Sequence, residues 1–217
     1  MSIRTTRVPA PLEPLFEQAE KMMTDLFSKV ELRPEHGDIR VSGTRYVLVG
    51  SDTFSSELHE ELRKAFGDAG ARQIRYRIAR ALGRRDAQII HSKLGVTDPT
   101  LKLALGPVHF AHVGWSFVEI LEDSAPGPDE NCFIHYLHPY SFESADWVES
   151  GRKAEQPVCV MNAGYSSGWV QESFGVELKG EELSCRAMGA EHCRFIMAHP
   201  SKFDARLEEY RARYAAG

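Results

Sequence analysis

Three cysteines and one carboxylate in the C-terminal part of the chain form a pattern that could bind a metal ion. They are Cys159, Glu182, Cys185 and Cys193. Soft thiolates together with one hard oxygen ligand suit a tetrahedral zinc ion. A catalytic zinc keeps one coordination position open for water or substrate, whereas these four side chains would fill every position. The pattern therefore predicts a structural zinc rather than a catalytic one.

The spacing alone leaves the fourth ligand open. Cys185 and Cys193 can close a knuckle, because a glycine between them lets the chain turn back toward the metal. Glu181 and His192 are rivals of Glu182 for the remaining position. The paired short Cys spacings of common zinc fingers are absent. Three buried free thiols without a metal are the alternative reading, since free cysteine is among the most buried residue types; the nearby carboxylate favours zinc.

Composition bounds the class of protein. A chain of 217 residues with 42% hydrophobic content can bury one sizeable core or two small ones. A net charge of −5 argues against direct nucleic-acid binding, and no basic, aromatic-rich stretch supports it. No run approaches the roughly 18 apolar residues that span a bilayer, and the N-terminus lacks the apolar segment of a signal peptide. We therefore expect a cytoplasmic protein without a membrane partner, whose cysteines are reduced or metal-bound.

The first half of the sequence predicts helices and one hairpin. Apolar residues recur at helical spacing over 11–30. Residues 37–49 alternate around the turn signal Ser42-Gly43, which predicts a β-hairpin. Two further helices are expected over 53–67 and 69–92. The second has many arginines on one face, and a solvated helix face explains them better than nucleic-acid binding.

The second half is richer in strands and aromatic residues. Asp98 is expected to cap a short helix that ends at Gly106-Pro107, where the proline breaks it. The other elements expected in chain order are strands at 108–122 and 132–138, a helix at 141–152, a strand at 158–161, a helix at 163–174, a strand at 193–198 and a closing helix over 203–214. The mixture predicts an α+β fold with an antiparallel sheet flanked by helices.

Several segments together resemble a known family. They are Asp38-Ile39-Arg40-Val41-Ser42-Gly43-Thr44-Arg45-Tyr46, Gly106-Pro107, Pro157-Val158-Cys159, Gly164-Tyr165-Ser166-Ser167-Gly168-Trp169, and the set of Glu182, Cys185 and Cys193. The chain, from about residue 37 to 200, resembles the aromatic-effector sensor domain of σ54-dependent, NtrC-type transcriptional activators. The resemblance implies that Glu182 is the fourth zinc ligand, in preference to His192 and Glu181.

The resemblance also implies a domain organisation. Residues 1–95 would form a helical and hairpin dimerisation segment, 96–200 a vinyl-reductase-like domain that binds ligand and zinc, and 201–217 a helical linker stub. The family implies a cytoplasmic homodimer that encloses a small aromatic or apolar ligand and controls an ATPase output domain. No phosphate-binding loop of the Gly-rich Lys-Ser or Lys-Thr kind occurs in this sequence. The output domain would therefore act in cis, if this is an excised sensor, or in trans, if it is a stand-alone relative.

The ligand pocket can be assigned only through the resemblance. The implied lining positions are Leu103, Phe110, His112, Tyr136, His138 and Trp169. If both segments are strands, Phe110 and His112 share one face, as do Tyr136 and His138. Phenol-responsive members use a histidine and a tryptophan to bind the effector hydroxyl, where this chain has Phe110 and His138. We therefore expect another aromatic, or a ligand whose polar group meets His112 or His138, rather than phenol.

Two other functions compete with a sensor. The first is an enzyme of the vinyl-reductase type in tetrapyrrole metabolism, which the same zinc-domain ancestry suggests. No nicotinamide or flavin fingerprint supports it, so we expect no enzyme activity. The second is a protein-interaction scaffold, which would have a filled core in place of a ligand cavity.

Overall fold

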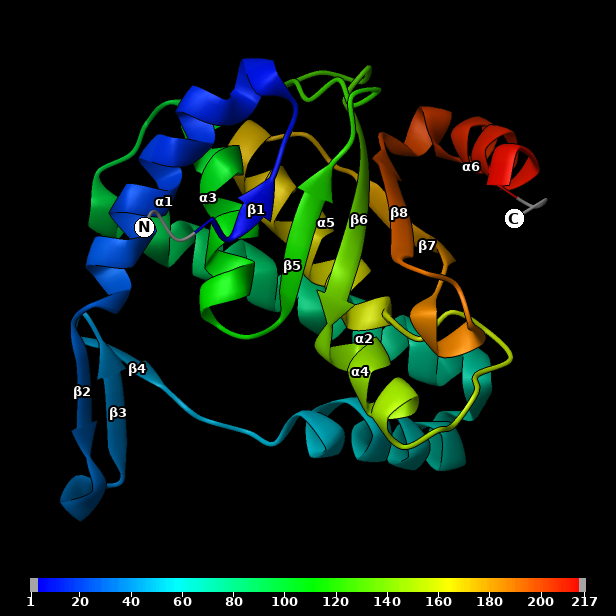
Figure 1. Cartoon of the computed structure of the whole chain (residues 1–217), viewed down its shortest axis with the longest axis horizontal. Helices are drawn as coiled ribbons and strands as arrows, with labels where there is room; N and C mark the ends of the chain where they lie inside the picture. The colour runs from blue at the N-terminus through cyan, green and yellow to red at the C-terminus, as the bar shows by residue number, and fades with distance from the viewer. Residues whose placement is uncertain (1–3, 215–217) are drawn as a thin grey trace.

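The computed structural model describes residues 4–214 and has an α+β fold (Figure 1). The helices are α1 (Glu13–Phe27), α2 (Leu58–Leu94), α3 (Pro99–His112), α4 (Phe142–Glu149), α5 (Val160–Phe174) and α6 (Pro200–Tyr214). The strands are β1 (Thr6–Arg7), β2 (Val30–Arg33), β3 (Asp38–Val41), β4 (Thr44–Tyr46), β5 (Ser116–Ile120), β6 (Phe133–Ser141), β7 (Lys179–Ser184) and β8 (Cys193–Ala198). No helix in this part of the chain is long and apolar enough to cross a membrane.

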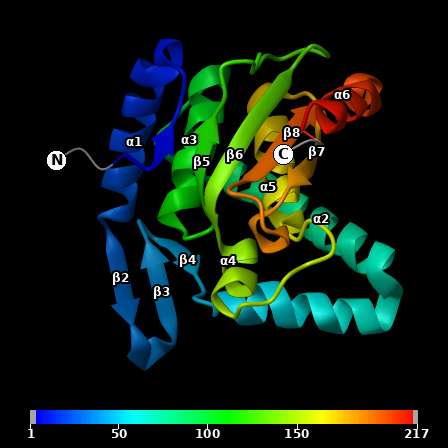
Figure 2. The ribbon, with the colours of Figure 1, turned by 45° about the vertical axis from the view of Figure 1, so that its right-hand side comes forward.

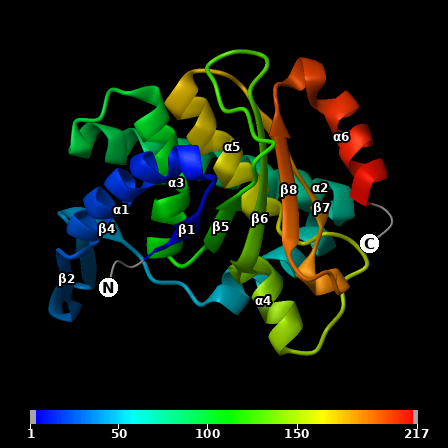
Figure 3. The ribbon, with the colours of Figure 1, turned by 45° about the horizontal axis from the view of Figure 1, so that its top comes forward.

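The main sheet has the strand order β1-β5-β6-β8-β7. The short β1 pairs with β5 in parallel, and every other pairing in this sheet is antiparallel. Helices α3 and α5 lie behind the sheet in Figure 1, with α2 running behind them. Helix α6 packs on the other face, where its Phe203 and Tyr210 join Phe133 and Ile196 in a small apolar cluster (Figure 3). Alternate residues of β6 and β8 therefore face two different helical layers.

A smaller sheet, β2-β3-β4, projects from the lower end of α1 (Figure 2). Its turn confirms the expected hairpin: Ser42 and Gly43 both have positive φ, 47° and 80°, as a two-residue type I′ turn requires. The sequence did not predict β2, which adds a third strand. Buried Asp38 accepts charged hydrogen bonds from Arg33 and Arg40, so this sheet has its own ionic core.

Helices α2 and α5 approach so closely that glycines are required between them. A Cβ atom on Gly168 would lie 2.0 Å from the Arg80 carbonyl oxygen, and one on Gly164 would lie 2.4 Å from the Tyr76 carbonyl oxygen. From the other helix, a Cβ atom added to Gly83 of α2 would lie 2.2 Å from the Tyr165 carbonyl oxygen. The glycines that interrupt the pattern of α5 thus let its backbone pack against that of α2.

Replacing Gly168 by alanine should therefore destabilise the protein. The methyl group would overlap backbone rather than a flexible side chain, so the two helices must separate, at a cost of about 1–3 kcal/mol or more. Gly127→Ala is the matched control, because its added Cβ would meet no atom within 4 Å. Urea unfolding should give a lower midpoint for Gly168→Ala only. Equal midpoints for the two variants would contradict the close packing.

Some sequence-based elements were wrong, and each error has a physical reason. Helix α3 does not end at Gly106-Pro107 but continues to His112, so residues 108–112 are helical and the strand begins at Ser116. A Cβ on Gly106 would lie 2.7 Å from the Trp169 indole. The glycine is therefore needed so that Trp169 can pack against α3, and it does not mark the end of the helix. Residues 158–161 form no strand, because Cys159 is the N-cap of α5. Strand β7 was not predicted.

Other expectations are confirmed. The Asp98 side chain caps α3 by accepting a hydrogen bond from the Leu101 amide at 2.7 Å. A kink at Gly67, whose φ is 70°, separates the two helices expected before residue 92. A π-helical turn, Thr53–Glu57, leads into α2.

Candidate functional site

The structure brings the four predicted metal ligands together. One ligand atom from each of Cys159, Glu182, Cys185 and Cys193 lies within 4.8 Å of all the others, and all four residues are buried. Cys159 precedes the first turn of α5, Glu182 lies in β7, Cys185 follows that strand and Cys193 begins β8. Strands β7 and β8, with the turn between them, would therefore supply three ligands, and the N-cap of α5 would supply the fourth.

The distances within this cluster fit a tetrahedral zinc ion. The Cys193 sulfur lies 3.6 Å from the Cys159 sulfur and 3.9 Å from the Cys185 sulfur. Zn–S bonds of about 2.3 Å in tetrahedral geometry separate two sulfurs by about 3.8 Å. Glu182 Oε2 accepts a hydrogen bond from the Cys159 amide at 2.7 Å, while its buried Oε1 has no hydrogen-bond partner in the described chain. A metal ion would satisfy that oxygen.

The two rival candidates for the fourth ligand, Glu181 and His192, contact other residues. Glu181 pairs with Arg211 of α6. His192 has a side chain that is 35% exposed, and its Nε2 lies 3.6 Å from a carboxylate oxygen of Glu191. Neither residue belongs to the buried cluster.

The electrostatics of the cluster also favour a cation. Burial is the largest cause that raises the pKa of both the Cys159 thiol and the Glu182 carboxyl well above their usual ranges. Four such groups cannot all ionise side by side in a buried site without a compensating positive charge. The Arg186 amide donates to the Cys193 sulfur at 3.3 Å, a contact that a metal-bound thiolate would accept.

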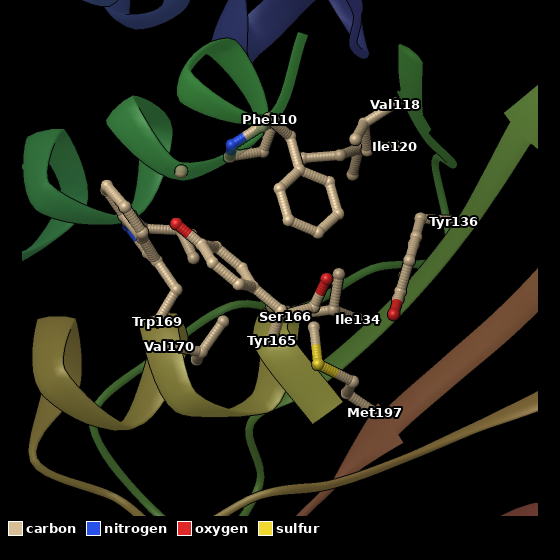
Figure 4. Close-up of a pocket in the computed structure, with 13 residues that line it drawn as sticks. Phe110, Val118, Ile120, Ile134, Tyr136, Tyr165, Ser166, Trp169, Val170 and Met197 are labelled. Carbon is tan, nitrogen blue, oxygen red and sulfur yellow. The ribbon is translucent and has the colours of Figure 1, made fainter. Parts of the chain in front are cut away.

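A second feature is an apolar cavity between the sheet and helices α3 and α5 (Figure 4). The residues that line it are Leu103, Gly106, Pro107, Phe110, Val118, Ile120, Ile134, Tyr136, Tyr165, Ser166, Trp169, Val170 and Met197. The centre of a water molecule can occupy about 40 Å³ of this cavity. One water needs roughly 10–15 Å³ by that measure, so the space suits a small ligand.

The cavity has few polar groups, and most nearby ones are already hydrogen-bonded. Trp169 Nε1 donates to the Lys102 carbonyl oxygen at 2.8 Å. The Tyr165 hydroxyl donates to Asp86 at 2.8 Å, outside the cavity. The Tyr136 hydroxyl is buried and has no hydrogen-bond partner within the described residues, and Ser166 lies next to the cavity with it. None of the lining side chains is charged.

Four of the six expected pocket residues line this cavity: Leu103, Phe110, Tyr136 and Trp169. His138 lies just behind it, with its ring centroid 5.2 Å from that of Tyr136 and 6.0 Å from that of Phe110. Burial lowers the pKa of His138 to about 3, so the ring is neutral, and neither ring nitrogen has a partner in residues 4–214.

His112 is separated from the other expected pocket residues. Its ring stacks on Phe27 of α1, with the centroids 4.8 Å apart. Residues two apart on a helix point about 200° apart, whereas the expected strand would have put Phe110 and His112 on one face. The error in the secondary structure of 108–112 therefore misplaced His112.

Sequence reasoning missed several lining residues. Val118 and Ile120 alternate along β5, a signal that could have identified them once the strand was correctly bounded. Tyr165 and Ser166 lie one helical turn before Trp169, on the same side of α5. Met197 of β8 comes from a distant part of the chain, and no local pattern identifies it.

Comparison with known proteins agrees with this arrangement. Residues 25–123 match the family described as activator of aromatic catabolism, and residues 141–198 match the V4R domain. The phenol regulator MopR of Acinetobacter guillouiae is 24% identical over 179 residues, which are 82% of this chain and 32% of MopR. This chain therefore spans about a third of that relative's length.

A solved structure has the same fold. The crystal structure of the phenol-responsive sensory domain of the transcription activator PoxR, with phenol, superposes with a TM-score of 0.72 at 22% identity. The match covers 93% of this chain and 98% of that one. The two domain matches, their order along the chain and this fold agree with the resemblance seen in the sequence. The chain thus carries a match to the activator-of-aromatic-catabolism family followed by a match to the V4R domain, which is the arrangement implied by its resemblance to aromatic-effector sensor domains.

Proposed function

We propose that this chain senses a small aromatic or apolar compound, which binds in the cavity between α3, α5 and the main sheet, and thereby regulates transcription. The observation that carries the proposal is the apolar, aromatic-lined cavity built from both halves of the chain. Leu103, Phe110, Tyr136 and Trp169 would contact the ligand directly, and His138 would support them from behind. His112, against Phe27, falls outside the proposed contact set.

The cysteine cluster would hold a structural zinc. Its distances, its burial and the unpartnered Glu182 Oε1 support that metal. Zinc bound there would join the start of α5 to β7 and β8. Because α5 and β8 also line the cavity, the metal would hold these two elements in a fixed relative position without contacting the ligand.

The wider organisation is part of the same proposal. Residues 1–95 would form the dimerisation segment, and Val47 and Leu48, which are 76% and 79% exposed beside β4, offer apolar surface for a second copy. Residues 201–217 would be the linker stub toward an output ATPase, because MopR is about three times as long as its matched region. The named relatives are transcription regulators, which favours this role over an enzyme of the vinyl-reductase type.

A binding experiment tests the proposed function. A panel of single-ring aromatic compounds should raise the melting temperature of the wild-type chain, because a ligand that binds only the folded state stabilises it. Ile134→Phe should abolish that shift by filling the cavity, whereas Val148→Phe on the exposed side of α4 should leave it unchanged. Equal shifts for both variants would place the ligand elsewhere, and no shift in the wild-type chain would contradict the proposal.

A further inference from the structure

The Tyr136 hydroxyl is an unusual group to bury without a partner. It is part of a residue that is 2% exposed, and its hydroxyl makes no close hydrogen bond in the described chain, with the Ser166 hydroxyl as a polar neighbour. Leaving a buried hydroxyl unpaired costs about 1–3 kcal/mol. Such a group is expected to be paired in the functional state, by a water or by a ligand.

The surroundings of this hydroxyl limit what can pair with it. Figure 4 shows the hydroxyls of Tyr136 and Ser166 on the side of the cavity away from Trp169. The facing residues Ile134 and Met197 offer no strong hydrogen-bonding group. The hydroxyls of Tyr136 and Ser166 thus form a short polar patch in an otherwise apolar cavity.

The neighbouring residues explain why these two hydroxyls remain available. Ser167 and Ser173 of α5 donate to carbonyl oxygens one turn earlier, those of Ala163 and Trp169. The Tyr165 hydroxyl is engaged by Asp86. Ser166, by contrast, borders the cavity.

The geometry points to Tyr136, assisted by Ser166, as the residue that selects the ligand: a neutral aromatic ring bearing one oxygen that accepts a hydrogen bond. This inference rests on the proposed function and names the ligand class of the same cavity. A hydroxyl or carbonyl oxygen on the ring would accept from Tyr136. A hydrocarbon would leave that hydroxyl unpaired, and a carboxylate would be buried against uncharged residues without a counter-ion.

This assignment differs from a histidine-based polar contact. Phe110 cannot form a hydrogen bond with its side chain, and the His138 ring lies behind Tyr136 rather than in the cavity lining. The neutral His138 ring is enclosed by aromatic neighbours, Phe110, Tyr136 and Phe195. Of Tyr136 and His138, only Tyr136 lines the cavity, so its hydroxyl is the group that can contact the ligand directly.

The test compares four probes of similar size: phenol, benzaldehyde, toluene and benzoate. Binding to the full wild-type chain is measured by calorimetry. Because one hydrogen bond contributes about 0.5–1.5 kcal/mol, we expect phenol and benzaldehyde to bind up to about tenfold more tightly than toluene. Phenol, which the sequence disfavoured because Phe110 and His138 replace the pair used by phenol-responsive members, becomes a suitable probe once Tyr136 supplies the polar contact. Benzoate should bind most weakly. Preference for toluene or benzoate over both neutral oxygen-bearing probes would overturn the inference.

Tyr136→Phe isolates the hydroxyl. It keeps the ring and should bring the ratio of phenol to toluene affinity close to one, without lowering the melting temperature of the ligand-free chain. Ser166→Ala should lower the ratio by a smaller factor. Tyr210→Phe is the matched control, since it removes a hydroxyl that donates to Asp123 on the opposite face of the sheet; its ratio should stay at the wild-type value.

Two outcomes separate this inference from the function on which it rests. An unchanged ratio in Tyr136→Phe, with the probes still binding, would overturn the role of Tyr136 and leave the sensor function standing. Failure of every probe to bind the wild-type chain would contradict the proposed function itself.

Discussion

Cys185→Ala is expected to yield a chain that does not fold to a stable native state. Structural zinc contributes an apparent free energy of about 10 kcal/mol to folding, and a domain of this kind has a total stability of about 5–15 kcal/mol. Removing one thiolate ligand also leaves Cys159 and Glu182 buried beside a weakened site. Circular dichroism and elemental analysis should show lost cooperative melting together with substoichiometric zinc.

Cys132 provides the matched control for that experiment. It is also buried, at 2% exposed against 0% for Cys185, but it lies outside the four-residue cluster. Its sulfur accepts only a long hydrogen bond from the Gly127 amide, at 3.4 Å. Cys132→Ala should cost about 1–2 kcal/mol and retain one zinc per chain. A folded, metal-free Cys185→Ala variant with the melting temperature of the control would contradict a structural zinc.

The sequence could predict most of the cysteine cluster. Three of the four proposed ligands are close in sequence, because β7 and β8 are neighbouring antiparallel strands joined by a short turn. Such local spacing is visible without a structure. Cys159 comes from a distant segment, and its membership depended on ligand chemistry and on the family resemblance.

The cavity was harder to predict, because it depends on contacts between distant segments. Periodicity identified α1 and α6, whose apolar faces are regular. It failed in α3, where Gly106-Pro107 has the local signature of a helix end. The Trp169 indole packs against Gly106 from α5, and only the tertiary contact explains why the helix continues there.

That single misassigned stretch also altered the expected pocket. As a strand, 108–112 would have pointed Phe110 and His112 the same way, and His112 would have been a polar contact for the ligand. As a helix, it directs Phe110 into the cavity and His112 toward Phe27. Tyr136 was named through the family resemblance and lines the cavity, whereas Ser166 was not named, since one serine in α5 has no distinguishing pattern.

Arg75→Met should cause the largest loss of stability outside the proposed metal site. Arg75 Nη2 lies 2.6 Å from Glu143 Oε1, and the two residues are 3% and 1% exposed. Glu143 also accepts hydrogen bonds from the Met161 and Asn162 amides at the start of α5. Removing one partner of a buried ion pair leaves an uncompensated charge, which costs about 3–5 kcal/mol. The pair joins α2 to the segment that carries Cys159.

The loss in Arg75→Met should depend on pH in a defined direction. Burial raises the pKa of Glu143 to about 7 despite the opposing Arg75 charge. A carboxyl whose folded-state pKa is raised loses stabilisation as pH rises through that value. Without Arg75 the folded-state pKa rises further. The melting temperature of Arg75→Met should therefore be close to the wild-type value near pH 5 and fall well below it near pH 8.

The double variant Arg75→Met/Glu143→Gln distinguishes an unpaired charge from lost packing. Glutamine can still accept a hydrogen bond at the start of α5 but carries no charge, so much of the stability lost in Arg75→Met should return at pH 8. The pH dependence attributed to Glu143 should be absent from the double variant, because glutamine does not titrate. If the double variant were no more stable than Arg75→Met at pH 8, the cost would come from the missing arginine contacts to His59 and to the Val158 carbonyl oxygen. The unpaired-charge explanation would then be wrong.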